Sequence, residues 1–297
     1  MIARTLCFSS AGRLSLRYEQ LVWTSADGVE RTIPIEDVGF VILESERIEI
    51  TVALLRFLSE KNVAVVLCDF SHMPSAQLLS YAAHTTAAEH IKVQLATTEA
   101  VCGRLWRQVC RRKILNQARL MERMGADNVR RMQELAESVK NGDPSNCEGQ
   151  AARLYFQTLE PKGFVRDRFG NWPNAALNYG YAVLRAAVAR AIVGSGLACF
   201  CGIHHHNRYN AFALADDIME PYRPFVDQYV LPGESRFDKP QAELSKEMRA
   251  RLLQVLSCDV RLGEFTRPLM VALSYTTASF VRAFKREAGE LVLPEML

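Results

Sequence analysis

The sequence predicts an α+β protein, with a small N-terminal β-rich domain over residues 1–75 followed by a large all-α C-terminal domain over residues 76–297. Two observations support this prediction. Hydrophobic residues alternate with a period of two in the first part of the chain, and beyond residue 76 they recur every three or four positions. A chain of 297 residues is also long enough for two domains with a sizeable buried core.

The strand-rich region is predicted from short alternating segments. Hydrophobic and polar residues alternate in "RLSLRY", "VERTIPI", "VGFVIL" and "RIEI", and "NVAVVLCD" is a continuous apolar run typical of a buried strand. One segment, "TVALLRFLSEKN", departs from this pattern because Leu54, Leu55 and Leu58 recur at helical spacing. We therefore expect one helix that covers the sheet.

The rest of the chain is predicted to be helical, with the change near residues 71–85. The segment "NAALNYGYAVLRAAVARAIVGSG" is nearly all apolar or small, "KPQAELSKEMRARLLQVL" is amphipathic, and "RPLMVALSYTTASFVRAFKREAG" closes the chain. Another helix is predicted from apolar residues at three- and four-residue spacing, namely Leu105, Trp106, Val109, Cys110 and Ile114.

Composition indicates a globular protein, with 49% hydrophobic and 23% charged residues. The N-terminus has no basic start followed by an apolar run, and the most apolar internal stretch is interrupted by Gly194, Ser195 and Gly196. We therefore expect neither secretion nor membrane insertion. The eight cysteines are scattered without a C-x-x-C pair, which predicts reduced thiols in a cytoplasmic protein.

Positive charge is concentrated in one helical segment. The formal net charge of the whole chain is only +3, yet residues 104–131 hold nine cations against two acids. Such a one-sided run is typical of a track for a polyanion. The alternative is a solvated face whose arginine stems cover apolar neighbours.

Glu148 opens the apolar stripe of another predicted helix. In "DPSNCEGQAARLYFQTL", Asp143 or Ser145 can cap the helix, and Glu148 lies four residues before Ala152 on the inward-facing side. A buried carboxylate needs a cation, a proton, helix-terminal amides or a metal ion. The first turn of a helix favours an acid in any case, so this helix alone leaves the choice open.

Three consecutive histidines precede an acidic cluster in "GIHHHNRYNAFALADDIMEPYRPFVD". Three adjacent imidazoles cannot all face one ion, and a lone histidine is more often a hydrogen-bonded core or surface residue than a ligand. Asp217 and Glu220 lie three residues apart on a helix predicted to begin near Asn210, so we expect them to project together. Because they repel each other, either Arg223 or a metal ion must neutralise them.

One imidazole with two or three carboxylates suits Mg²⁺ or Mn²⁺ better than a structural zinc ion. Such an ion activates a hydroxyl nucleophile and neutralises charge on a phosphoryl group, so phosphodiester chemistry connects the acidic cluster with the basic segment. A second cationic stretch, "PKGFVRDRFGNWP", interleaves cations with Phe164, Phe169 and Trp172. These aromatic residues either stack on bases or anchor a loop to the core. Its cations are Lys162, Arg166 and Arg168.

Three motifs, in this order, resemble those of the CRISPR-associated spacer-acquisition integrase family, the "Cas one" family: "NCEGQAARLYF", "NAALNYGYAVLR" and "GIHHHNRYNAFALADDIMEPYRPFVD". The resemblance extends over essentially the whole chain. It implies a metal-dependent DNA endonuclease and integrase with a C-terminal catalytic domain and an N-terminal dimerisation domain. The third motif is most similar to the variant that accompanies type II effectors.

The resemblance also implies a site and partners. The family's metal ligands, a Glu, a His and an acidic residue, fall on Glu148, His205 and Glu220. Glu220 stands where many relatives have Asp, so Asp217 either ligates the ion or contacts its ligands. His204 and Arg223 are further residues expected to contact the ligands. The implied partners are double-stranded DNA as spacer precursor and CRISPR repeat, a second copy of the chain, and the small "Cas two" protein. The residues predicted to bind DNA are Arg104, Arg107, Arg111, Arg112, Lys113, Arg119, Arg123, Arg166 and Arg168.

Two alternative functions remain compatible with the sequence. A metal-dependent nuclease that resolves branched DNA would use the same ligands for water instead of a 3′-hydroxyl. A non-catalytic DNA-binding scaffold would carry the acidic cluster for structural reasons only. Removal of metal and the change Glu148→Ala would leave the function of such a scaffold intact.

Overall fold

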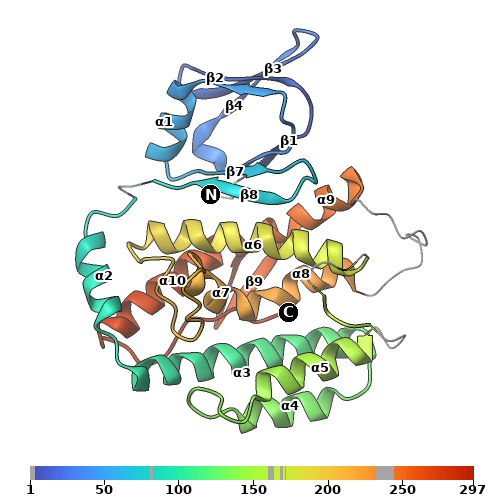
Figure 1. Ribbon diagram of the computed structural model, residues 1–297, viewed down its shortest axis with the longest axis vertical. Coiled ribbons are helices and arrows are strands. Elements are labelled where there is room, and N and C mark those ends of the chain that lie inside the picture. The colour runs from blue at the N-terminus through green and yellow to red at the C-terminus, as the bar shows by residue number, and fades with distance from the viewer. Residues whose placement is uncertain (1–3, 81–82, 160–163, 168–169, 171, 232–243) are drawn as a thin grey trace.

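The computed structural model describes residues 4–80, 83–159, 164–167, 170, 172–231 and 244–297. An N-terminal β-rich region lies at one end of the molecule and a mostly helical region at the other (Figure 1). The predicted order of β-rich and helical parts is therefore confirmed. No helix within the described ranges is long and apolar enough to cross a membrane.

Two four-stranded sheets build the N-terminal region. The first has the order β4 (Glu30–Pro34), β3 (Gln20–Ser25), β2 (Gly12–Arg17) and β6 (Ile48–Ile50). The second has the order β1 (Arg4–Phe8), β5 (Val38–Leu43), β7 (Ala64–Cys68) and β8 (Pro74–Leu78). The predicted helix is α1 (Val52–Glu60), which is capped by the side chain of Thr51, and its Leu54 and Leu58 are buried in the core of this region.

The second sheet joins the two regions because both of its faces are covered. Phe40 and Ile42 of β5 belong to the core of the helical region, whereas Val41 and Leu43 belong to the N-terminal core. Successive side chains of a strand point to opposite faces, which is why this strand is apolar throughout. β8 pairs with β7 and ends at Leu78, which is past residue 75 but within the range 71–85 where the change was predicted.

Helix α6 (Asn174–Gly194) lies along the second sheet and forms the centre of the helical region (Figure 1). Most of its residues are buried, which explains its apolar sequence. Beyond it, away from the sheets, α3 (Glu99–Arg123) packs with α4 (Val129–Ser138) and α5 (Cys147–Leu159). The remaining helices are α2 (Ala87–Leu95), α7 (Ala213–Met219), α8 (Arg223–Val230), α9 (Lys246–Leu253) and α10 (Leu269–Phe284).

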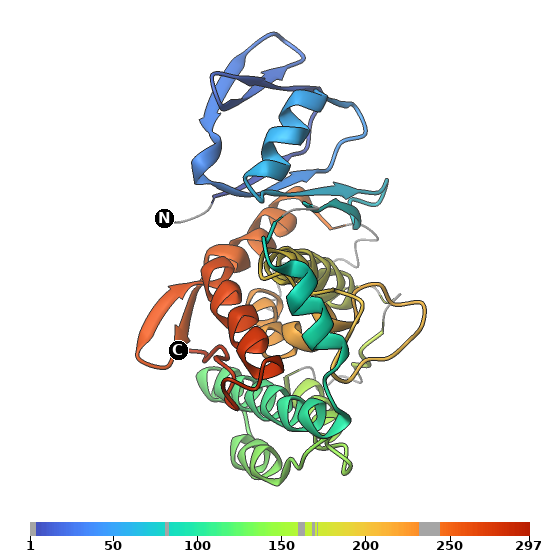
Figure 2. The same ribbon diagram turned by 90° about the vertical axis from the view of Figure 1, so that its left-hand side faces the viewer.

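The C-terminal region is not all-α as predicted, because β9 (Asp259–Leu262) and β10 (Phe265–Pro268) form an antiparallel hairpin. Figure 2 shows this hairpin projecting from the helical region, close to the C-terminus. Val260 and Leu262 are buried while Asp259 and Arg261 are exposed, the period of two expected of a strand. The segment is only four residues long, too short to stand out in a helical context.

Candidate active site

Glu148 is held at the start of α5 by two capping side chains. The carboxylate of Asp143 accepts hydrogen bonds from the backbone N–H groups of Cys147 and Glu148, both at 2.9 Å. The side chain of Asn146 accepts a third, from Gly149, at 3.2 Å. These bonds satisfy N–H groups that a helix N-terminus leaves free, so they fix where α5 begins and where Glu148 points. Asp143 is one of the two caps predicted from the sequence, the other being Ser145, whereas Asn146 was not predicted.

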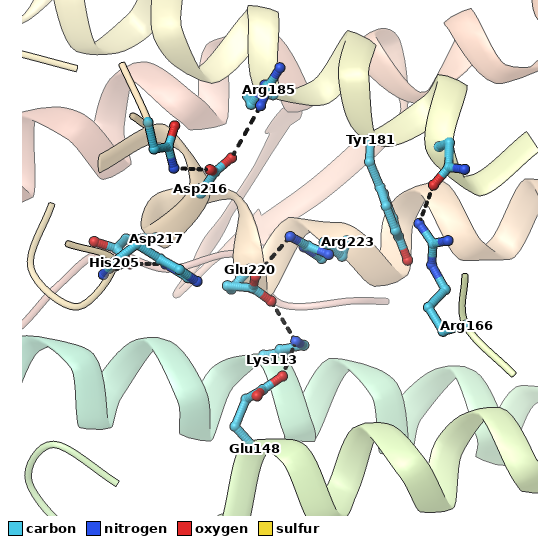
Figure 3. Close-up of polar contacts among 12 residues, drawn as sticks. Lys113, Glu148, Arg166, Tyr181, Arg185, His205, Asp216, Asp217, Glu220 and Arg223 are labelled. Carbon is cyan, nitrogen blue, oxygen red and sulfur yellow. Dashed lines mark hydrogen bonds and ion pairs between the residues drawn. The ribbon is translucent and has the colours of Figure 1, made fainter. Parts of the chain in front are cut away.

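Lys113 connects two of the predicted ligands. Its ammonium forms ion pairs with Glu148 and Glu220, and its Nζ lies 2.5 Å from Oε2 of Glu220 (Figure 3). The side chains of Lys113 and Glu220 are each only 7% exposed. Burial alone would lower the pKa of Lys113, but the carboxylates of Glu220 and Glu148 raise it above its ordinary value. The residue is therefore a buried cation within the site.

This position differs from the prediction that Lys113 lies on the DNA-binding face. Lys113 is nine positions from Arg104, about two and a half helical turns, and therefore lies on the opposite side of α3. Its neighbours on that side are the buried residues Cys110 and Ile114. A count of charges along the segment does not distinguish the exposed face of a helix from its buried face. The three- and four-residue spacing of the apolar residues does mark the buried face, on which Lys113 lies.

Arg223 supplies a second cation to Glu220. Its Nη2 lies 3.0 Å from Oε1 of Glu220, and its guanidinium stacks over the ring of Tyr181 at 4.8 Å from the centroid. Burial alone would raise the pKa of Glu220, but Arg223 and Lys113 lower it below its ordinary value. Glu220 is therefore ionised at neutral pH, and Arg223, one of the two neutralising groups considered from the sequence, contacts it directly.

Asp217 faces the loop that carries His204, His205 and His206, here called the histidine loop, and not the cations that contact Glu220. Its buried carboxylate accepts hydrogen bonds from the backbone N–H groups of Ile203, His204 and His205 at 2.6, 3.0 and 3.2 Å. The expectation that Asp217 and Glu220 project together is wrong, because Glu220 contacts Lys113 and Arg223 instead of the loop. Figure 3 shows Asp217 turned to His205 while Glu220 points to Lys113.

His205 is the histidine whose ring a carboxylate orients. Its Nδ1 lies 2.6 Å from Oδ1 of Asp217, and this hydrogen bond raises the pKa of His205 above its ordinary value. His204 instead stacks on Trp106, with ring centroids 4.0 Å apart and planes within 3° of parallel, and burial lowers its pKa. His206 is exposed. A histidine held through Nδ1 keeps Nε2 for a metal ion, which favours His205.

Over the described residues, no three His, Cys, Asp or Glu side chains are arranged to hold a metal ion. The ammonium of Lys113 stands between Glu148 and Glu220, so a cation already bridges these carboxylates. The donor types nevertheless fit Mg²⁺ or Mn²⁺, which prefer carboxylate oxygens and accept imidazole. Oε2 of Glu220 is also buried without a well-directed hydrogen bond from any described donor, although it touches the ammonium.

A pocket of about 560 Å³ lies beside the carboxylates. Its walls include the cations Arg153, Arg166 and Arg223 and the aromatic rings of Phe156 and Phe164. Arg166 was predicted to bind DNA on a basic loop, but its guanidinium donates to the side chains of Asn174 and Asn178 at 2.9 and 2.6 Å inside this wall. Arg168, Lys162 and Phe169 lie outside the described residues.

Asp227 is a buried acid of the same pocket wall that was not among the residues predicted from the sequence. The hydroxyls of Tyr155 and Tyr181 donate to it at 3.0 and 2.6 Å. Burial raises the pKa of Asp227 to about 6, although both hydroxyls favour its charged form. Each of the three residues lies in a different one of the three motifs, so spacing within a motif could not show that they meet.

The remaining predicted DNA-binding residues lie on α3 and differ in how exposed they are. Arg112 is half-buried, and its Nη2 lies 2.8 Å from Oε1 of Glu295 near the C-terminus. The others are exposed, and they are Arg104, Arg107, Arg111, Arg119 and Arg123. These five arginines remain exposed on α3 without Lys113 and Arg112, and one of them, Arg119, forms an ion pair with Glu122 at 2.6 Å.

A carboxylate and imidazole site beside a basic helix defines the class of protein as an enzyme that acts on nucleic-acid phosphodiesters. The sequence matches the family described as CRISPR associated protein Cas1 over residues 6–236. The chain belongs to this family. It is 36% identical over 299 residues to the CRISPR-associated endonuclease Cas1 of Neisseria meningitidis serogroup C (strain 8013), covering 100% of this chain and 97% of that relative.

Solved structures share the fold. A casposase bound to an integration product superimposes with a TM-score of 0.78 at 17% identity, covering 98% of this chain and 92% of that one. A Cas6-RT-Cas1–Cas2 complex gives a TM-score of 0.76 at 20% identity, covering 100% of this chain and 37% of that one. The predicted family is thus confirmed, and with it the function of an endonuclease and integrase in spacer acquisition.

Proposed function

We propose that this chain joins the 3′-hydroxyl end of a short DNA fragment to a phosphodiester of a CRISPR repeat at a site formed by Glu148, His205 and Glu220. The observation that supports it is the convergence of α5, the histidine loop and the turn after α7, which carry two carboxylates and an oriented imidazole toward one another (Figure 3). These three residues are the proposed catalytic residues and ligands of Mg²⁺ or Mn²⁺.

The ion, when bound, neutralises charge on the phosphate and on the attacking or leaving oxygen. The side chains of the protein orient the ligands and position the phosphate. Asp217 accepts from Nδ1 of His205 and so leaves Nε2 for the ligand role. Arg223 and Arg166 line the pocket beside the carboxylates, where guanidinium groups suit a phosphate oxygen.

The exposed arginines of α3 are proposed to hold the backbone of double-stranded DNA. Contacts of this kind carry little sequence information and weaken steeply with salt. The casposase that shares this fold is bound to an integration product, which supports a DNA substrate for this chain. Spacer precursor and repeat would both be held through their phosphates.

We further propose that the chain acts in the cytoplasm as a homodimer together with the small "Cas two" protein. The Cas6-RT-Cas1–Cas2 complex supports this partner, because the Cas1 fold occurs there beside Cas2. The N-terminal region is the proposed dimerisation domain. Association with a type II effector is supported by the amino-acid sequence of the motif from Gly202 to Asp227. Size-exclusion chromatography with light scattering, with and without the partner, measures the assembly.

The experiment that tests the function is transfer of a labelled, 3′-hydroxyl-ended duplex into a supercoiled plasmid that carries a repeat, with Mn²⁺ and the small partner present. Wild-type protein should give joined product. Glu148→Ala, His205→Ala and Glu220→Ala should lose it and keep DNA binding. Plasmid that is cleaved but not joined would favour a branched-DNA nuclease. DNA binding without joined product, unchanged by chelation and by Glu148→Ala, would favour a scaffold.

A further inference from the structure

We propose that Lys113 is an internal counter-ion of the site, whose ammonium occupies the cation position between Glu148 and Glu220 until a divalent ion displaces it. This inference rests on the metal site proposed above. It assigns Lys113 a role in setting metal affinity, in place of the DNA contact expected from the sequence.

The ammonium of Lys113 contacts both carboxylates at once. One Nζ atom forms ion pairs with both carboxylates, although these come from α5 and from the turn after α7. A cation bound to the same two oxygens must therefore occupy much of the same space. Mg²⁺ binds carboxylate oxygens at about 2.0–2.1 Å, slightly closer than an ammonium does, so the two cations exclude each other.

The charges of the two carboxylates are balanced by two cations. Glu148 and Glu220 contribute two negative charges, and Lys113 and Arg223 contribute two positive charges in direct contact with them. The charges of these four side chains are thus balanced before any ion binds, and burial of the two carboxylates is compensated. A divalent ion gains less from a neutral site than from a dianionic one, so retaining Lys113 lowers its affinity.

An acceptor for the displaced ammonium lies nearby. Gln117 follows Lys113 by four residues on α3, so the two side chains lie on the same face of the helix. Both line the 560 Å³ pocket. Oε1 of Gln117 is buried and receives no hydrogen bond from the described residues, which makes it a ready second partner for the ammonium. Lys113 therefore has two positions available, one against the carboxylates and one in the pocket.

The test is calorimetric binding of Mn²⁺ to the full chain without DNA. Lys113→Met removes the charge and keeps the length of the side chain, and it should bind Mn²⁺ at least about tenfold more tightly than wild type. Lys61→Met, which removes an exposed lysine at the end of α1, is the matched control and should not change the affinity. In EDTA, Lys113→Met should unfold at a lower temperature than wild type, and Mn²⁺ should raise its unfolding temperature by more.

Unchanged or weaker Mn²⁺ binding by Lys113→Met would overturn the inference, because Lys113 would then support the ligands. If Glu148→Ala left Mn²⁺ binding intact, the metal site itself would be wrong and the proposed function would fail with it. If Lys113→Met bound Mn²⁺ more tightly but no longer joined DNA, the result would support the counter-ion role and not the proposed joining function. This outcome therefore distinguishes the two proposals.

A second test measures the accessibility of amines in the wild-type chain and then removes the proposed acceptor, Gln117. Reductive methylation of the wild-type chain, followed by mass spectrometry, reports the accessibility of each amine. Methylation of Lys113 should be low in EDTA and rise in Mg²⁺ as the ammonium moves into the pocket. Gln117→Leu should weaken Mn²⁺ binding in the wild-type background and have no effect in Lys113→Met. Methylation that does not respond to Mg²⁺ would overturn the displacement.

Discussion

Nδ1 of His205 lies 2.6 Å from Oδ1 of Asp217, a carboxylate that is fully buried. The same carboxylate accepts three successive backbone N–H groups of the histidine loop, so one side chain fixes both the loop and the ring. This arrangement separates the two acids that the sequence had paired. Asp217 positions a ligand, and Glu220 is the acid that faces the other carboxylate.

Asp217→Asn should lower the affinity for Mn²⁺ by about 10- to 100-fold, because groups that orient a ligand contribute on this scale. The amide can no longer accept all four hydrogen bonds, so the ring of His205 loses its fixed direction. Calorimetry measures the effect, with His206→Asn as control since His206 is exposed. Equal losses in the two variants would contradict a specific role for Asp217.

Asp143→Ala should destabilise the protein by about 1–2 kcal/mol, since it removes an acceptor from two N–H groups at the start of α5. Because the same turn carries Glu148, joining activity should fall as well. Urea unfolding measures the free energy. Asn146→Ala removes a single, longer hydrogen bond and should cost less, and the reverse order would argue against Asp143 as the main cap.

Replacement of Arg104 and Arg111 by Gln should weaken DNA binding and reduce the slope of log affinity against log salt by about one unit for each phosphate that is no longer bound. Mn²⁺ affinity should not change, because both residues lie on the exposed face of α3. Arg17→Gln with Arg56→Gln makes the same change in net charge on the N-terminal region. If this control lowered the salt slope equally, the effect would reflect net charge and not a binding surface.

Arg249→Met should cost about 3–5 kcal/mol of stability, because it leaves Glu44 buried without its cation. Nε of Arg249 lies 3.1 Å from Oε1 of Glu44, and the hydroxyl of Tyr179 donates to the same oxygen at 3.2 Å. The three residues join α9 and α6 to the strand-rich region. Adding Glu44→Gln should recover part of the loss in thermal unfolding, whereas additive losses would contradict a coupled pair.

Asp227→Asn should change how stability depends on pH. The pKa of Asp227 is raised to about 6, above the value near 4 of an unfolded chain, so the folded state binds the proton more tightly. Its contribution is fully present below about pH 4 and is lost as pH rises through about 6. Urea unfolding from pH 4 to 7 should therefore show Asp227→Asn gaining relative to wild type, by up to about 3 kcal/mol. A constant difference across this range would show that Asp227 does not titrate there.

Much of the fold and the ligand types could be predicted from local patterns. Alternation in "RLSLRY" and the helical spacing of Leu54 and Leu58 depend only on neighbours in the chain, and so does the cap at Asp143. The hairpin of β9 and β10 was missed because four residues are too few for a period to be distinguished. The motifs were also sufficient to indicate the family.

By itself the sequence determined the order of the β-rich and helical parts, the family and the residue types of the site. Only the tertiary structure decided which charges meet. Lys113 belongs to a basic run along the chain, yet the packing of α3 against α5 and the turn after α7 buries it between Glu148 and Glu220. Asp217 and Glu220 are near neighbours in sequence, yet Asp217 contacts the histidine loop and Glu220 contacts Lys113. The reason is physical, since secondary structure follows from local periodicity, whereas ion pairs depend on how distant elements pack in three dimensions.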